Sequence, residues 1–431
     1  MNMKKNLLMV ALVAMGCTIV SCSESKDETI VCPEPKTINL LPTTRQPIEL
    51  TTEEQQFATD NNNFALNFLK TVNDADNSGK SFIYSPLSIT YVLGMVNSAA
   101  TGQTEQEIEQ TLGFHQGGIQ AINNYCKKLI DGLPKTDEKV TLNIANAIFV
   151  NKNLATLKPQ YQQDMLQYYN AKAENMNFDS PTTLATINSW ANNQTNGMID
   201  KILDRIEGGA ISYLLNAIYF KADWASKFDP KMTKTETFYG YNGNTQLPLM
   251  HQNVLIYYMK NDIFSAVSIP YGNGLWNMTV LLPNEGNTTN DIITSLAKSN
   301  FQKDVYFKMH SYEVDLKIPR FETTSDTDDL EGNLIGIMKK LGIKEAFDQN
   351  VSEIPNMCNE GNLYINKMRQ KAAIKVNEEG SEAAAVTVAE MNFTTSLPEE
   401  KRKVTFHADR PFVYLITEAS TGVIMFVGSV R

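Results

Sequence analysis

The chain has 431 residues, of which 42% are hydrophobic and 20% are charged, a balance typical of a folded globular protein. Its formal net charge is −10, whereas binding to nucleic-acid phosphates needs clustered lysine and arginine side chains. The composition therefore excludes a disordered chain and argues against a nucleic-acid partner.

The N-terminus has the features of a secretory signal. Lys4 and Lys5 precede an apolar run over residues 7–20, which is too short to span a bilayer as a mature helix. We therefore expect residues 1–21 to be a signal peptide that takes no part in the fold.

A cysteine follows this run at a position suited to lipid attachment. Residues 19–22 resemble the lipobox of bacterial lipoproteins, in which small residues precede a cysteine that becomes diacylated and N-terminal. On this interpretation Cys22 carries the lipid, and two acyl chains anchor the protein stably to a membrane. Residues 26–28 also resemble a surface-export signal, which predicts the outer-membrane cell surface of a Gram-negative bacterium. The alternative is an ordinary cleavage site and a freely secreted protein.

The next segment, residues 22–50, contains several prolines and no apolar periodicity, so we expect an extended tether. Thr51 and Glu54 then have the spacing of a capping box, which predicts the start of an amphipathic helix. Its apolar residues at helical intervals are Phe57, Phe64, Phe68 and Leu69.

At the other end of the chain, two apolar runs over residues 413–416 and 423–427 flank Thr421 and Gly422, a pattern that predicts a buried hairpin. Mixed helical and strand patterns lie between the two ends, with no internal repeat. We therefore treat residues 51–431 as one α+β domain.

Motifs for catalysis or metal binding are absent from the sequence. None of the 4 histidines stands in a zinc-binding pattern, and no nucleophile elbow or phosphate-binding loop occurs. Beyond the signal region, Cys32, Cys126 and Cys358 have no spacing typical of a disulfide framework or a metal site. We therefore assign no catalytic residue, metal or cofactor, and we do not expect an enzyme.

An alanine-rich stretch near residue 383 has an unusual pattern. If it is a strand, one face carries only small uncharged residues, while Glu382 and Glu390 lie on the other face. The small residues are Ser381, Ala383, Ala385, Thr387 and Ala389. One face could thus enter a core, although an ordinary strand followed by a long loop has the same alternation.

This stretch resembles the hinge of inhibitory serpins, in which acidic residues, a glycine, a threonine or serine and a glutamate precede a run of alanines. The matching residues are Glu378, Glu379, Gly380, Ser381, Glu382, Ala383, Ala384 and Ala385. Other segments are also similar to serpins: residues 84–89, 188–199, 216–228, 281–283 and 406–428. The resemblance covers residues 53–431.

The resemblance implies a serpin fold with three β-sheets, about nine helices and an exposed reactive-centre loop over residues 378–405. It implies a monomeric inhibitor of serine or cysteine endopeptidases that acts as a suicide substrate. A target protease forms an acyl-enzyme with the loop, which then inserts into the central sheet and traps the protease. The alternative within the family is a non-inhibitory serpin that acts as a carrier or interaction protein.

The scissile bond follows from the family's usual spacing. Counting forward from the hinge implies Thr394 as the specificity residue and Thr395 after the cut, which suits an elastase-like or subtilisin-like protease. Cleavage one bond earlier, after Phe393, would suit a chymotrypsin-like pocket. Counting back from Phe406 gives a later residue because the loop is longer than usual, so the position within 391–403 stays open.

The resemblance also implies residues that control opening of the sheet. Ser85, Ser88 and Asn216 correspond to the shutter of serpins, and Trp224 to the breach where insertion begins, with simple core packing as its alternative. Two departures are Ser81, where many serpins have Asn, and Gln370, where many have His, although both side chains can hydrogen-bond.

Before cleavage, we expect Ser381 near the solvent-exposed end of the hinge.

Overall fold

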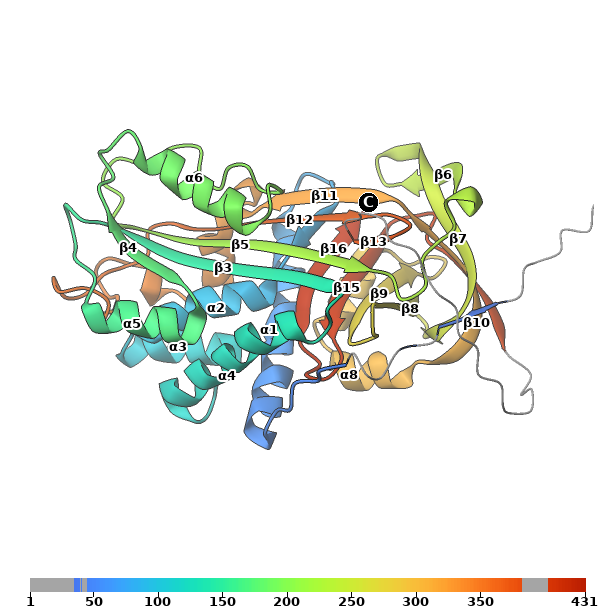
Figure 1. The fold of residues 1–431 in the computed structure, drawn as a ribbon, viewed down its shortest axis with the longest axis horizontal. Helices are drawn as coiled ribbons and strands as arrows, with labels where there is room; N and C mark the ends of the chain where they lie inside the picture. Colours follow the sequence, from blue (N-terminus) through green and yellow to red (C-terminus); the bar gives the residue numbers. More distant parts are fainter. Residues whose placement is uncertain (1–34, 39, 41–44, 382–401) are drawn as a thin grey trace, which may run out of the picture. The chain divides into compact units, whose positions relative to one another are not determined.

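The computed structural model describes residues 35–38, 40, 45–381 and 402–431. Within these residues, one sheet has 6 strands in the order β11-β12-β13-β5-β3-β4 (Figure 1). Their bounds are β3 Val140–Asn151, β4 Lys172–Met176, β5 Ser212–Asp223, β11 Phe321–Asp326, β12 Met368–Val376 and β13 Gly380–Ser381. Strand β12 runs parallel to β5, whereas the 2-residue strand β13 is antiparallel to both.

The other sheet of the described residues has 10 strands, in the order β14-β10-β7-β8-β9-β15-β16-β2, with β1 and β6 also paired to β7. Their bounds are β1 Lys36–Thr37, β2 Phe82–Tyr84, β6 Lys234–Gly240, β7 Gly243–Lys260, β8 Phe264–Tyr271, β9 Trp276–Pro283, β10 His310–Pro319, β14 Lys403–His407, β15 Phe412–Glu418 and β16 Ile424–Val430. The long strand β7 pairs with β6 and β10 over most of its length and with β8 at its end. Because β7 joins these parts, the three sheets expected from the sequence form two hydrogen-bonded networks.

Helices cover both faces of the six-stranded sheet, with α6 on one side and α2, α4 and α5 on the other (Figure 1). The α-helices of the described residues are α1 Thr52–Ala75, α2 Pro86–Asn97, α3 Gly102–Leu112, α4 Gly118–Gly132, α5 Pro159–Tyr169, α6 Thr183–Gln194, α7 Thr289–Leu296, α8 Phe301–Asp304 and α9 Asn333–Leu341. No helix in this part of the chain is long and apolar enough to cross a bilayer.

Two predicted elements at the ends of the domain are confirmed. Thr51 and Glu54 form a reciprocal capping box at the start of α1, and the four predicted apolar residues of this helix are buried. At the C-terminus, β15 and β16 form the predicted antiparallel hairpin, and every residue of the two strands is buried.

Strand β5 separates two hydrophobic cores. Leu214, Ile218 and Phe220 face the main core, whereas Leu215 and Ala217 face a smaller core beneath α6. A strand that is buried on both faces needs a nearly continuous apolar sequence, which explains the composition of β5.

The stretch before α1, expected to be an extended tether outside the fold, contacts the domain where it is described. Strand β1 pairs in parallel with Val254 and Leu255 of β7. Closer to α1, the Gln46 amide donates to the Thr136 carbonyl at 3.3 Å, and the Ile48 amide donates to Ser420 Oγ at 2.9 Å. Because backbone groups of this stretch make these contacts, the apolar periodicity of the sequence gave no sign of them. The predicted signal peptide and Cys22 lie outside the described residues.

Candidate functional site

The first hinge residues lie inside the six-stranded sheet. Ser381 pairs with Val376 of β12 and with Ala222 of β5, so β13 separates these two strands at one end of the sheet. Ser381 is 0% exposed, and its hydroxyl is hydrogen-bonded to the Tyr271 hydroxyl at 2.7 Å. The prediction that Ser381 lies near a solvent-exposed end of the hinge is therefore wrong. A small polar side chain can be buried here because Tyr271 supplies its partner.

Position 380 requires a glycine because the backbone of β5 approaches it closely. A Cβ atom at this position would lie 2.0 Å from the Ala222 carbonyl oxygen and 2.7 Å from Asp223 Cα. Both contacts are with backbone atoms, which cannot move aside without displacing the strand. Any residue larger than glycine would therefore push β13 away from β5.

Trp224 contacts the hinge directly. Its indole Nε1 donates to the Asn377 carbonyl at 2.8 Å, and its backbone amide donates to the Glu379 carbonyl at 2.8 Å. The indole ring also stacks on Tyr271, with ring centroids 4.3 Å apart and planes 9° apart. Trp224 thus holds the turn that leads into β13, in addition to packing in the core.

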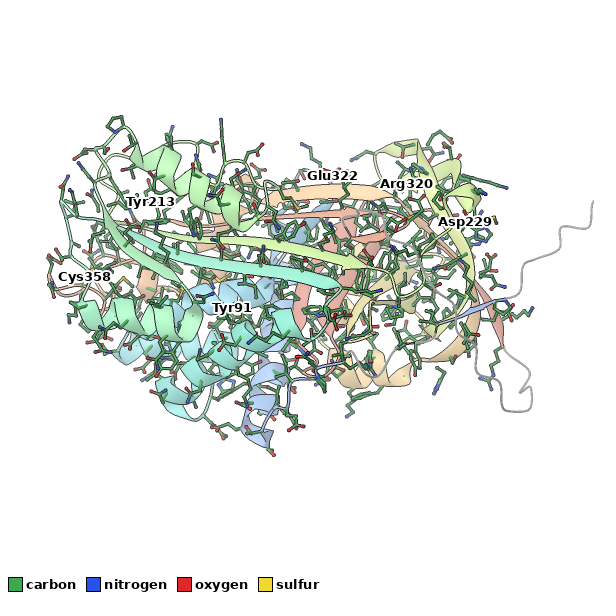
Figure 2. The ribbon with its side chains drawn as sticks, viewed as in Figure 1. Tyr91, Tyr213, Asp229, Arg320, Glu322 and Cys358 are labelled. Carbon is green, nitrogen blue, oxygen red and sulfur yellow. The ribbon has the colours of Figure 1, made fainter. Side chains whose placement is uncertain are left out.

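An ion pair fixes the start of the hinge. Arg320, between β10 and β11 (Figure 2), donates from Nε to both carboxylate oxygens of Glu378 at 2.8 and 2.7 Å. Thr233 also donates to this carboxylate. Burial alone would raise the pKa of Glu378, but the hydrogen bonds from Arg320 and Thr233 outweigh it and lower the pKa. The neighbouring Glu379 pairs with Lys227. Glu378 and Glu379 therefore each have a cationic partner.

The residues assigned to the shutter come together with Gln370. This fully buried side chain accepts from the Ser85 amide at 2.9 Å and donates to the Ser85 carbonyl at 2.9 Å and to Asn216 Oδ1 at 3.2 Å. Ser85 donates through its hydroxyl to Ser88, and Asn216 donates to Asn146 Oδ1 at 2.9 Å. A chain of polar side chains thus connects α2 with β12, β5 and β3.

Ser81 does not belong to this cluster. Its hydroxyl accepts from the Arg431 amide at 3.0 Å. Ser81 directly precedes β2, whose partner β16 ends at Val430, so the pairing of these strands carries it to the C-terminus of the chain. The expectation that Ser81 contributes to the shutter is corrected accordingly.

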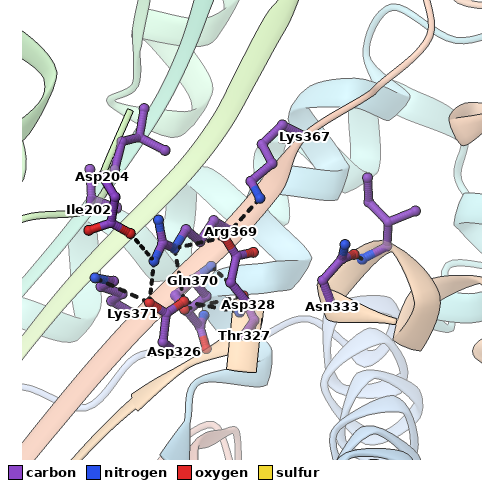
Figure 3. A network of polar contacts seen from close by, with 12 residues as sticks. Ile202, Asp204, Asp326, Thr327, Asp328, Asn333, Lys367, Arg369, Gln370 and Lys371 are labelled. Atoms are coloured by element: carbon purple, nitrogen blue, oxygen red, sulfur yellow. Dashed lines mark hydrogen bonds and ion pairs between the residues drawn. The ribbon is translucent and has the colours of Figure 1, made fainter. Parts of the chain in front are cut away.

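The opposite face of β12 carries an ionic network that the sequence analysis missed (Figure 3). Arg369 is only 7% exposed at its side chain, and it pairs with Asp326 and Asp328 and, at 3.2 Å, with Asp204 in the segment between α6 and β5. Burial would lower the pKa of Arg369, but Asp326 outweighs it and raises the pKa. The sequence contains a signal for this network, because the basic residues Lys367, Arg369 and Lys371 alternate with other residues around the start of β12.

The residues that follow the predicted loop form β14, which pairs in parallel with β10. Lys403 Nζ lies 2.9 Å from Glu313, and His407 Nε2 lies 3.0 Å from Asp315, which also contacts His251 at 2.7 Å. Burial would raise the pKa of Asp315, but its two histidine partners outweigh it and lower the pKa. Both ends of the loop are thus attached to sheets.

The remaining predicted site residues lie outside the described residues. They are Glu382, Ala383, Ala384, Ala385, Phe393, Thr394 and Thr395, together with Cys22.

Comparison with known proteins defines the family. The family model described as "Serpin (serine protease inhibitor)" matches residues 59–431, so the chain belongs to the serpin family. Members of this family are mostly protease inhibitors rather than enzymes.

Individual serpins are similar over most of their length. Serpin-ZX of Arabidopsis thaliana is 29% identical over 387 residues, which cover 86% of this chain and 96% of that protein. The native state of tengpin, a thermophilic serpin, aligns with a TM-score of 0.76 at 26% identity and covers 92% of this chain and 96% of its own. Human thyroxine-binding globulin, solved in complex with its ligand, aligns with a TM-score of 0.77 at 26% identity. The alignment covers 88% of this chain and 98% of that chain.

Proposed function

We propose that this chain inhibits serine endopeptidases as a suicide substrate and traps the acyl-enzyme by inserting its cleaved loop between β12 and β5. Cysteine endopeptidases are a second target class. The observation that carries the proposal is β13, which already lies between these strands.

The proposed reaction starts as ordinary proteolysis. The protease serine attacks the scissile carbonyl after Thr394, or after Phe393, and an ester forms while the peptide bond breaks. The new amine, at residue 395 or 394 respectively, leaves with the proton that the protease's general base took from the serine. The residues between Ser381 and the ester are then free to continue β13. Inhibition is a race between this insertion and hydrolysis of the ester.

The length of the sheet suits this mechanism. The 13 residues that follow Ser381, up to Thr394, would span about 43 Å as a strand. The flanking strand β5 has 12 residues. A fully inserted strand would therefore carry the bound protease to the opposite end of the sheet, where the acyl-enzyme can be distorted.

A protease panel tests the proposal. The mature domain is incubated with elastase-like, subtilisin-like, chymotrypsin-like and trypsin-like enzymes, and each is also tested with its catalytic serine blocked. We expect at least one active enzyme to give a complex that survives denaturing electrophoresis, and sequencing of the released peptide locates the cut. Cleavage by every active enzyme without such a complex would favour the non-inhibitory carrier or interaction protein instead.

Trypsin-like enzymes provide an internal comparison. A cut after Lys401 or Arg402 would leave an acylated strand longer than one ending at Thr394, and therefore a slacker tether. We expect such enzymes to treat the protein mainly as a substrate, and a stoichiometric stable complex linked at Arg402 would contradict this.

We also propose that the protein acts outside the cytoplasm, anchored by lipid on Cys22 at the bacterial cell surface. The support is the lipobox-like sequence over residues 19–22. Replacement Cys22→Ser should move the protein from the membrane fraction to the soluble fraction, and an unchanged distribution would contradict anchoring.

A further inference from the structure

The two strands that must separate during insertion are paired directly over part of their length. Residues Met368–Ala372 of β12 run parallel to Leu214–Ile218 of β5, with Arg369 opposite Leu215. We call this boundary the seam. A strand that enters the seam moves β12 and β5 apart by one further strand spacing, about 4.8 Å. A side-chain contact that crosses the seam must therefore break, unless one of its partners leaves its own side.

Arg369 is fixed on one side of the seam. Its Nε donates to Asp326, the last residue of β11, at 2.9 Å and lies 3.3 Å from Asp328. Strand β11 pairs with β12 along the edge that faces away from β5. The Arg369 side chain is 7% exposed, so packing also holds it in place. Arg369 therefore moves with β11 and β12.

Asp204 is fixed on the other side of the seam. It lies between α6 and β5, directly after Ile202 and Leu203, which are buried in the smaller core with Leu215 of β5. The backbone amides of Ile202 and Leu203 both donate to Asn188 Oδ1 of α6 at 2.9 Å. Asp204 therefore moves with α6 and β5.

An ion pair joins these two residues across the seam (Figure 3). Arg369 Nη2 lies 3.2 Å from Asp204 Oδ2. The next residue of β12, Gln370, faces the opposite side of the sheet and donates to Asn216 of β5 at 3.2 Å. The seam is thus closed by a side-chain contact on each face. Separation of β12 and β5 by one strand spacing would take both contacts beyond their range.

We propose that the ion pair between Asp204 and Arg369 is a latch on the α6 side of the seam, and that its rupture forms part of the barrier to insertion. The proposal rests on the proposed inhibitory function and adds Asp204 to it as a positioning residue that acts through Arg369. The step changes no covalent bond and follows the attack by the protease. The latch stabilises the closed seam and is absent once a strand has entered.

Asp204 can be replaced without leaving a buried charge unpaired. Its side chain is 72% exposed, and Arg369 keeps its pairs with Asp326 and Asp328 when Asp204 is removed. We therefore expect Asp204→Ala to fold and to insert its cleaved loop about threefold faster than the wild type. The reason is that the closed seam loses an interaction that the inserted state does not have.

Two further variants control for the substitution itself. Asp204→Glu keeps the charge and can still reach the guanidinium, so its insertion rate should lie within about 1.5-fold of the wild type. Asp200→Ala removes an exposed carboxylate of the same segment, which accepts from Asn192 of α6 at 3.2 Å and so stays on one side of the seam. Its insertion rate should equal that of the wild type.

Salt dependence separates a latch from a merely structural role of Asp204. Because Asp204 is largely exposed, dissolved salt screens its ion pair. The ratio of the Asp204→Ala rate to the wild-type rate should be about threefold at about 50 mM salt and close to one at about 1 M salt. A ratio that stays constant would overturn the proposal.

The insertion rate is the limiting rate at which excess inhibitor inactivates a protease identified by the panel. Release of the C-terminal peptide measures acylation separately, and the protease is chosen so that acylation is the faster step. Equal limiting rates for the wild type and Asp204→Ala would overturn the latch. If Asp204→Ala does not fold, Asp204→Asn should still insert faster than the wild type, and equal rates would again overturn it.

A separate measurement decides the proposed function. The melting temperature of the wild type is compared before and after its loop is cut by a protease that is not inhibited. No rise would contradict insertion itself, and the latch with it. If the wild type gains stability on cleavage but Asp204→Ala inserts no faster, the latch is wrong and the proposed function stands.

Discussion

The position of Ser381 in the sheet imposes two requirements on its side chain. It is small enough to lie between β12 and β5, and its hydroxyl pairs with Tyr271, whose own hydroxyl would otherwise be buried without a partner. The sequence indicated that one face of this strand carries small residues, but it did not indicate that Ser381 is buried. Alternation shows which side of a strand a residue faces, and it does not show how much of the strand already lies within the sheet.

Replacement Ser381→Arg should abolish inhibition. Burying the guanidinium without a partner would cost several kcal/mol, so the hinge should leave the sheet in the intact protein and should not re-enter after cleavage. We expect altered tryptophan fluorescence, because Trp224 contacts this turn, and a loop that is cleaved without trapping the protease.

The control is Ser381→Ala, which loses one hydrogen bond, costs about 1 kcal/mol and should still inhibit. If Ser381→Arg traps its protease one to one, insertion through this hinge is not the mechanism.

Glu378 makes the stability of the hinge depend on pH. Its pKa is lowered in the folded protein, so its stabilising contribution is present above the pKa of the unfolded state and is lost as the pH falls through the folded pKa. Glu378→Gln should lower the free energy of unfolding by about 1 kcal/mol at neutral pH, since Arg320 is half exposed and already well hydrated.

The difference between Glu378→Gln and the wild type should begin to shrink once the pH falls below the ordinary pKa of glutamate, because the wild-type carboxyl then takes up a proton on unfolding. Urea unfolding at neutral pH and near pH 4 measures it. A difference that is the same at both pH values would show that the ion pair with Arg320 contributes nothing.

At the scale of the elements, the sequence predicted the helices and strands whose signals lie within a short stretch of the chain. The first helix was predicted from Thr51, Glu54 and its apolar spacing, and the terminal hairpin from two apolar runs around Thr421 and Gly422. The pairing of β1 with β7 and the burial of β13 depend on contacts with distant strands, which no local pattern encodes. Family resemblance gave the shutter residues, but only the register of β2 and β16 showed that Ser81 lies elsewhere.

Gln370 connects the elements that must separate when a strand inserts. Replacement Gln370→Leu would leave the Ser85 amide and carbonyl and the Asn216 side chain without their partner, so we expect a loss of about 2–4 kcal/mol in the free energy of unfolding. Gln370→His, which restores a side chain that can donate and accept, should lose clearly less.

Urea unfolding of both variants beside the wild type measures this contribution. A Gln370→Leu protein as stable as the wild type, within about 0.5 kcal/mol, would show that the polar chain across α2, β12 and β5 does not stabilise the intact sheet.

At the scale of the whole molecule, the described part of the six-stranded sheet contains a very short strand, β13, between β12 and β5. Strand β13 has 2 residues, whereas the neighbouring β5 has 12. The described residues on either side of the segment between β13 and β14 are both held in sheets, at Ser381 and at Lys403. Cleavage removes this restraint, and the added strand would gain hydrogen bonds on both edges and bury its small face.

The melting temperature of the intact protein and of the protein cut between Met391 and Thr395 tests this account most directly. We predict that the cut form melts higher by more than about 10 °C, which corresponds to at least several kcal/mol for a chain of this size. Equal melting temperatures for the cut and intact forms would contradict loop insertion, and with it the inhibitory mechanism.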